Sequence, residues 1–322
     1  MAAQTPLLAV EGLTVDITTQ RGTLRAVRGI SFAVKAGETF CLVGESGCGK
    51  SMTAMSIMGL LPKVATRSFR QLAFEGRKLD VRETDRLNGA EIAMIFQEPM
   101  TSLNPIFSIG DQLMEGYLRH KQSSVAEARE RALFLLDKVG IANGAQRLTQ
   151  YPHQLSGGLR QRVMIAMALM CGPKLLIADE PTTALDVTIQ AQILRLLASL
   201  GQEFGLGLML ITHDLGLVAR VATRVAVMYA GEIVEEGTTA EVFSAPKHPY
   251  TRGLMACIPV PGRTKPGEPL GAIPGVVPSL IGDISGCAFR DRCSLAGPEC
   301  AADIPERQSG THRWRCLREE AA

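Results

Sequence analysis

The first 60 residues carry the pattern of several strands followed by a helix. Residues 7–17 alternate loosely between apolar and polar, and residues 30–34 predict a second strand. The unbroken apolar run 39–43 is typical of a strand buried on both faces of a parallel sheet. A glycine-rich loop follows, and residues 50–60 predict a helix that Pro62 ends.

The middle of the chain is more helical. Apolar residues fall at helical spacing over 125–139, where Ser124 can cap the helix and Gly140 can end it. Further predicted elements are a buried helix at 163–170, a strand at 174–178, a helix at 189–200 and a strand at 207–212. This alternation predicts an α/β fold with a mostly parallel sheet and helices on both of its faces.

The pattern changes near Glu235. Residues 246–285 hold many of the 17 prolines, which is unlike a regular domain core and indicates an extended linker or wrapping arm. This segment leads into a group of cysteines at the end of the chain. No internal repeat is evident.

Length and composition fit a protein with a substantial core. The 322 residues suggest about two domains, and 46% apolar residues exclude disorder or a small disulfide-stapled fold for the whole chain. A net charge of +2 argues against nucleic-acid binding through a whole-protein field, although it leaves room for a local basic patch. The N-terminal residues lack a targeting pattern, and the longest apolar run, 163–171, is about half of a membrane span. We therefore expect a soluble, intracellular protein.

Cysteine is distributed unevenly. Four of the eight cysteines fall in the last 36 residues: Cys287, Cys293, Cys300 and Cys316. In a reducing compartment such a group indicates metal or redox chemistry before disulfides. Cys41 and Cys171 lie in apolar segments and are expected in the core.

A phosphate-binding loop joins the apolar strand at 39–43 to the helix that follows it. Its pattern, G-x-x-x-x-G-K-[ST], is formed by Gly44, Glu45, Ser46, Gly47, Cys48, Gly49, Lys50 and Ser51. The glycines let backbone N–H groups surround phosphate oxygens, and the helix N-terminus adds its positive dipole end. Lys50 would reach the β- and γ-phosphates of ATP, and the Ser51 hydroxyl would bind Mg²⁺.

Two carboxylates end the strand predicted at 174–178. Following a phosphate-binding loop, Asp179 would hold the Mg²⁺ shell and Glu180 would act as general base on the attacking water. Alone, the same pattern would equally describe a buried strand that ends in two solvated acids.

A second anion site is predicted just before the helix at 163–170. Ser156, Gly157 and Gly158 stand just before an arginine-flanked helix start, where free amides and the dipole favour an anion. The alternative, a flexible Ser-Gly-Gly linker, is disfavoured because the helix begins at once.

Three further residues are weak signals taken singly. Gln97 follows an apolar strand and could contact Mg²⁺ and the attacking water, and His213 ends another strand and could contact the γ-phosphate. Asp186, in Ala-Leu-Asp, is similarly weak. Each alone would more often be an ordinary surface residue.

Together, these motifs in this order resemble the ATP-binding subunit of an ABC transporter over residues 5–240. The resemblance implies a RecA-like mixed-sheet core with an antiparallel β-subdomain and a helical subdomain at about 98–160. It also implies a head-to-tail dimer that encloses each ATP, with Ser156 and Gly158 serving the γ-phosphate across the interface. Glu180, His213 and Gln97 would be catalytic. The family usually stacks adenine on an aromatic residue, where this chain has Ile17.

Residues 241–322 resemble the C-terminal extension of the oligopeptide/dipeptide uptake subfamily. The resemblance rests on segments at 248–251, 258–262, 273–278 and 286–293. In that subfamily the four C-terminal cysteines are associated with a [4Fe–4S] cluster. Their own spacing, C-x5-C-x6-C-x15-C, leaves a cluster, Zn²⁺ or unliganded thiols open, although the absence of close Cys pairs favours the cluster.

The resemblance implies an ATPase that powers import of di- or oligopeptides. Nickel or glutathione import by the same machinery is the alternative, and a non-transport ATPase acting on nucleic acid or the ribosome is a competing class. Expected partners are two membrane permease subunits, a second ATPase subunit, identical or paralogous, and an extracytoplasmic binding protein, with no nucleic acid. Residues 98–105 resemble the permease contact region. The expected location is peripheral, on the cytoplasmic face of the inner membrane.

Overall fold

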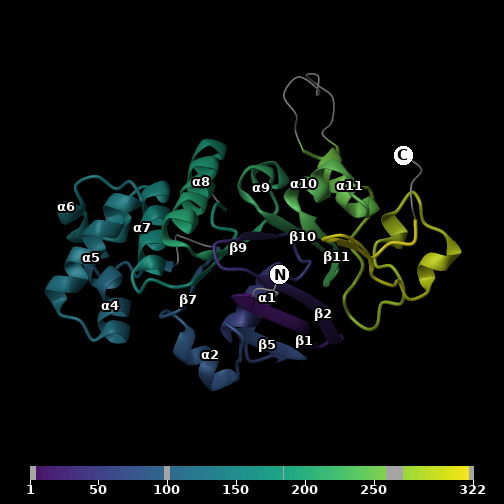
Figure 1. Cartoon of the computed structure of the whole chain (residues 1–322), viewed down its shortest axis with the longest axis horizontal. Coiled ribbons are helices and arrows are strands. Elements are labelled where there is room, and N and C mark those ends of the chain that lie inside the picture. The colour runs from purple at the N-terminus through teal and green to yellow at the C-terminus, as the bar shows by residue number, and fades with distance from the viewer. Residues whose placement is uncertain (1–4, 98–101, 184, 259–270, 319–322) are drawn as a thin grey trace. The chain divides into compact units, whose positions relative to one another are not determined.

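The computed structural model describes residues 5–97, 102–183, 185–258 and 271–318, and its chain forms two compact units (Figure 1). The first unit contains residues 1–8, 34–39 and 74–211, and the second contains residues 9–33, 40–73 and 212–322. Each unit therefore gathers segments that are far apart in the sequence. Among the described residues, none of the helices combines the length and apolar character that crossing a membrane requires.

Three parallel strands form the centre of the first unit. They are β7 (Ile92–Ile95), β8 (Leu175–Asp179) and β9 (Gly207–Thr212), with β8 between the other two. All residues of β8 and β9 are buried, as expected for strands covered on both faces. Because the strands are parallel, their carboxyl ends share one edge of the sheet.

Helices make up most of the remaining first unit. They are α2 (Val81–Leu87), α4 (Ile109–Lys121), α5 (Val125–Lys138), α6 (Gly144–Leu148), α7 (Gly157–Leu169) and α8 (Val187–Phe204). Figure 1 shows α4, α5, α6 and α7 gathered beside one another, and these helices pack together. The expected helix after Ser124 is confirmed: the Ser124 side chain caps α5, and Gly140 follows it with a φ of +74°. A short β6 (Arg77–Lys78) and a 3₁₀ turn at Pro152–Gln154 complete the unit.

The second unit contains an antiparallel layer built from the N-terminal segments. Its strands are β1 (Leu8–Thr19), β2 (Gly22–Val34), β4 (Ala65–Ser68) and β5 (Gln71–Phe74). The order is β2-β1-β5, and β4 pairs antiparallel with β1. The strand expected at 30–34 is the end of the longer β2.

The other strands of the second unit come from both ends of the chain. They are β3 (Thr39–Val43), β10 (Arg224–Tyr229), β11 (Glu232–Thr238), β12 (Arg307–Ser309) and β13 (His312–Trp314), in the order β12-β13-β11-β10-β3. Only β3 and β10 are parallel. The associated helices are α1 (Lys50–Met58), α9 (Leu215–Val221), α10 (Thr239–Ser244) and α11 (Pro249–Ala256), with 3₁₀ turns at Arg290–Arg292 and Pro298–Ala301.

The prediction of an extended arm over 246–285 is wrong for its first part. Pro249 begins α11, and Tyr250 and Thr251 are fully buried. Proline is well suited to the first helical position because its fixed φ is helical and no N–H bond is lost there.

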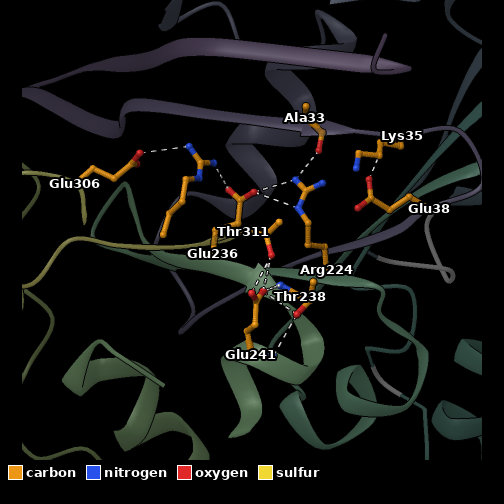
Figure 2. Close-up of polar contacts among 10 residues, drawn as sticks. Ala33, Lys35, Glu38, Arg224, Glu236, Thr238, Glu241, Glu306 and Thr311 are labelled. Carbon is orange, nitrogen blue, oxygen red and sulfur yellow. Dashed lines mark hydrogen bonds and ion pairs between the residues drawn. The ribbon is translucent and has the colours of Figure 1, made fainter. Parts of the chain in front are cut away.

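Two half-buried arginines and the buried Glu236 connect the C-terminal strands to the rest of the second unit. Figure 2 shows Arg224 between the Ala33 carbonyl (2.7 Å) and the carboxylate of Glu236 (2.9 Å). Glu236 also accepts from Arg313 on β13 at 2.7 Å. The extension therefore contributes to the polar interior of this unit.

Candidate functional site

The loop between β3 and α1 needs its glycines. A Cβ at Gly44 would stand 2.1 Å from the carbonyl oxygen of Met228, and one at Gly49 would stand 2.3 Å from that of Ala26. Gly47 has open space around it but a φ of +79°, which disfavours other residues. Because Gly49 precedes α1 without a capping side chain, the first amides of α1 are left to other acceptors.

Lys50 is folded back onto this loop. Its side chain is buried, and Nζ donates to the carbonyl oxygens of Gly44 (2.8 Å) and Glu45 (3.0 Å). Cys48 is also buried, and this burial raises the pKa of its thiol, while the nearby Lys50 opposes that shift. Ser51 follows Lys50 in the first turn of α1.

Tyr250 and Arg292 of the C-terminal extension bind Glu45, a contact that the sequence did not predict. The Glu45 N–H donates to the Tyr250 hydroxyl at 2.9 Å, and Arg292 donates to both Glu45 carboxylate oxygens, at 2.6 and 3.0 Å. Tyr250 and Arg292 stand more than 200 residues beyond the loop. The only available signal was a tyrosine and an arginine within the segments that carry the subfamily resemblance.

The two carboxylates at the end of β8 have different environments. Asp179 is buried, whereas Glu180 is half-buried and has a φ of +43°, a left-handed conformation that is strained for a residue with a side chain. The Glu180 N–H donates to the Ile211 carbonyl at 2.9 Å. Its Oε2 accepts from Gln97 Nε2 at 3.0 Å and from Thr183 Oγ1 at 3.1 Å. The structure thus brings Gln97 and Glu180 together, and it adds Thr183.

The Ser-Gly-Gly segment is the start of α7. Ser156 is the N-cap, and its Oγ accepts from the Leu159 N–H at 3.4 Å. The helix begins at Gly157 rather than at the predicted 163, because the cap lets the two glycines and the arginines form its first turns. A Cβ on Gly158 would lie 3.3 Å from Ile189 of α8, so a larger residue would press on that helix.

Asp186 and His213 have local surroundings of different kinds. Asp186 is the N-cap of α8, and its Oδ1 accepts from the Ile189 N–H at 3.0 Å. His213 is exposed directly after β9. The loop at 44–51 and His213 belong to the second unit, whereas Asp186 and Glu180 belong to the first. Ile17 is half-buried on β1, opposite Ala65 of β4.

The four C-terminal cysteines gather in one region of the extension. The Cys287 N–H donates to the Cys300 carbonyl at 2.8 Å, and all four thiols are free. Burial raises the pKa of Cys287 to about 11, and the negative charges of Cys316, Cys300 and Cys293 add to that rise. Within the described ranges, no three His, Cys, Asp or Glu side chains are arranged as ligands of one metal ion. Cys41 and Cys171 are buried, as expected.

Two family models match this chain. The ABC transporter model covers residues 27–183, and the model of the oligopeptide/dipeptide transporter C-terminal region covers residues 234–300. The dipeptide transport ATP-binding protein DppD of Bacillus subtilis is 49% identical over 96% of this chain and 94% of its own. The chain belongs to the ABC transporter family. It is an ATPase of that family, and it carries the oligopeptide/dipeptide C-terminal region.

Other relatives and solved structures agree with this membership. The DppD protein of Escherichia coli is 50% identical over 93% of this chain and 92% of its own. The cassette MJ0796, solved as a post-hydrolysis dimer bound to ADP and Pi, has a TM-score of 0.64, 27% identity, and coverage of 72% of this chain and 98% of its own. CbiO1 from Clostridium perfringens has a TM-score of 0.63, 30% identity, and coverage of 75% and 92%. The predicted ABC-type ATPase fold is therefore confirmed.

Proposed function

We propose that this ABC ATPase powers the import of di- or oligopeptides through a membrane transporter. The observation that carries the proposal is the near full-length similarity to a dipeptide transport ATP-binding protein, at 49% identity over 96% of the chain. The match of residues 234–300 to the oligopeptide/dipeptide region supports it. Import of nickel or glutathione is the alternative cargo, and a non-transport role on nucleic acid or the ribosome is a less supported one.

The proposed roles of the site residues follow from the order of the motifs along the chain. Residues 44–51 would bind the ATP phosphates and Lys50 would leave its loop carbonyls to contact the β- and γ-phosphates. Asp179, Ser51 and Gln97 would hold Mg²⁺, whose charge stabilises the transferring phosphoryl group. Glu180 would take a proton from the attacking water, and the hydrogen bonds from Gln97 and Thr183 would orient its carboxylate. His213 would contact the γ-phosphate.

The proposed assembly encloses ATP between two ATPase subunits. Ser156, Gly157 and Gly158 at the start of α7, with Asp186, would face the nucleotide held by the partner's loop. Residues 1–240 would form the ATP-binding domain, with a helical subdomain at about 98–160, and residues 241–322 would form the extension. Two permeases and an extracytoplasmic binding protein would complete a complex on the cytoplasmic face of the inner membrane. Of the expected permease contact, residues 98–101 lie outside the described residues.

Transport by a reconstituted complex tests the cargo. Vesicles that hold the permeases, the binding protein and this chain are expected to accumulate a labelled dipeptide when ATP is supplied to the side of the ATPase. Lys50→Ala should abolish accumulation because the lysine that contacts the phosphates is gone. ATP-dependent uptake of Ni²⁺ or glutathione without dipeptide uptake would contradict peptide import.

We propose further that Cys287, Cys293, Cys300 and Cys316 hold a [4Fe–4S] cluster, with Zn²⁺ as the alternative. The support is chemical: one segment supplies four cysteines without disulfides, and three of them add to the rise in the pKa of the fourth, Cys287, so that together they offer thiol ligands suited to either metal centre. Bound, a cluster would tie the segment together through thiolate bonds.

Metal analysis of anaerobically purified protein tests this site. Stoichiometric iron and sulfide with broad visible absorption are expected, and Cys300→Ser should lose them. Cys257→Ser is the matched control, since Cys257 lies outside the group, and it should retain them. Stoichiometric zinc without sulfide would replace the cluster by the zinc site, and protein without either metal would overturn both.

A further inference from the structure

Glu45 of the phosphate-binding loop is held at two points by the C-terminal extension. We propose that Arg292 and Tyr250 are positioning residues for ATP binding, which fix the loop through the carboxylate and the amide of Glu45. This inference rests on the assignment of residues 44–51 as the ATP-phosphate site, and it does not depend on the transported cargo or on a metal centre.

Arg292 is buried, and its hydrogen bonds hold the guanidinium in one orientation. Its side chain is 4% exposed, and Nη1 and Nη2 donate to the two Glu45 carboxylate oxygens. Nε donates to the Pro274 carbonyl at 3.0 Å, Nη2 to that of Ile273 at 3.1 Å, and Nη1 to the Tyr229 hydroxyl at 3.4 Å. These bonds use all five guanidinium hydrogens. Lysine could reproduce neither the fork nor the backbone contacts.

Aromatic packing keeps both positioning residues in place. The Tyr250 ring lies 4.5 Å from Tyr229 and 5.3 Å from Phe289, between ring centroids. The Arg292 guanidinium lies over Tyr229 and Phe289, at 5.8 and 5.9 Å from their centroids. All these residues belong to the same compact unit as the loop. The contact is therefore a fixed part of that unit rather than an exposed ion pair.

Two physical routes connect this contact to ATP binding. First, the Glu45 carboxylate carries a negative charge inside a loop that must accept phosphates, and Arg292 neutralises it. Second, the Tyr250 hydroxyl accepts from the Glu45 N–H at 2.9 Å and so fixes the backbone at the start of the loop whose later amides would surround the phosphates. Loss of Arg292 is thus expected to weaken ATP binding more than it changes turnover at saturating ATP.

Equilibrium binding of ATP to the full chain, with Mg²⁺ and a fluorescent ATP analogue as probe, tests the proposal. Arg292→Gln should weaken binding on the order of 10-fold, because an uncompensated carboxylate then faces the phosphates. Adding Glu45→Gln to that variant should restore most of the affinity, since the repelling charge is removed. Arg290→Gln is the matched control: Arg290 belongs to the same 3₁₀ turn and bonds the Ser285 carbonyl instead of Glu45.

A second variant guards against a folding defect. Tyr250→Phe keeps the ring and removes only the hydroxyl that accepts from the Glu45 N–H, and it should weaken binding about 3-fold while lowering the melting temperature by only a few degrees, so that the protein stays folded in the assay. Wild-type affinity in both Arg292→Gln and Tyr250→Phe would overturn the proposal. So would weakened binding that Glu45→Gln does not relieve, because general destabilisation would then be the cause. If the wild-type chain bound no ATP, or Lys50→Ala bound as well as wild type, the assignment of the loop itself would fail instead.

Discussion

Glu180 combines a strained backbone with a side chain that is held from two directions. The left-handed φ of +43° is unusual for a glutamate, and the bond from its N–H to the Ile211 carbonyl supports that conformation. Gln97 and Thr183 both donate to Oε2.

Replacing this carboxylate should separate binding from turnover. Glu180→Gln keeps the size of the side chain but cannot accept a proton, so ATP binding should persist while turnover falls by about 10²–10⁴. Phosphate release and equilibrium ATP binding measure the two effects. Glu203→Gln, which alters an exposed partner of Lys138, is expected to leave both unchanged. Hydrolysis at the wild-type rate in Glu180→Gln would contradict the general-base assignment.

At the scale of elements, the sequence predicted correctly those strands and helices whose signal lies within a few consecutive residues. The apolar runs at 39–43 and 207–212 are β3 and β9 within their predicted bounds, and the Ser124 cap fixes the start of α5. Gln97 and Glu180 could be expected at one edge because parallel strands end together. Helix α11 was missed because proline content was averaged over a long segment, whereas a single Pro249 at the first position favours a helix.

His248, at the start of α11, should make the free energy of unfolding depend on pH. His248 Nδ1 accepts from the Tyr250 N–H at 3.1 Å, and burial lowers the pKa of His248 from 6.5 to about 4, against the opposing pull of Glu235. Between pH 4 and 6.5 the unfolded chain therefore binds more protons. The free energy of unfolding should therefore be highest above pH 6.5. It should fall by about 3 kcal/mol in total as the pH falls towards 4.

Unfolding in urea at pH 7 and pH 5 checks this dependence. His248→Asn supplies a cap that does not titrate, so this variant should lose less stability than wild type between the two pH values. His153→Asn changes an exposed histidine and should keep the wild-type dependence. Equal losses in His248→Asn and wild type would show that another group is responsible.

At the scale of the whole molecule, the extension is part of a folded unit. Strand β13 pairs with β11, placing Trp314 opposite Glu235, and Arg292 reaches the loop at 44–51. The sequence placed the start of the extension at residue 241, where the resemblance to the ATP-binding subunit ends, shortly after the composition changes near Glu235. It could not find these contacts, since they join residues about 80 to 250 positions apart and leave no periodic signal. A buried carboxylate opposite a strand from the far end of the chain is visible only in three dimensions.

Glu235 is the residue through which this attachment can be tested. It is completely buried, accepts from the N–H groups of Lys247 (2.7 Å) and His248 (2.8 Å), and contacts His312 Nε2 at 2.7 Å. Glu235→Ala leaves these groups buried without their partner, so the free energy of unfolding should fall by about 3–5 kcal/mol.

Trp314, the only tryptophan in the chain, reports on the extension by its fluorescence. In Glu235→Ala the urea midpoint measured by Trp314 fluorescence should fall clearly below that of wild type. The reason is that Glu235 on β11 contacts both His312 on β13 and the backbone of His248 at the start of α11. Glu306→Ala removes a half-exposed partner of Arg313 and should cost less than about 1 kcal/mol. If the fluorescence midpoint of Glu235→Ala matched that of Glu306→Ala, the extension would be held by its other contacts, and the buried glutamate would not be what fastens it to the ATPase.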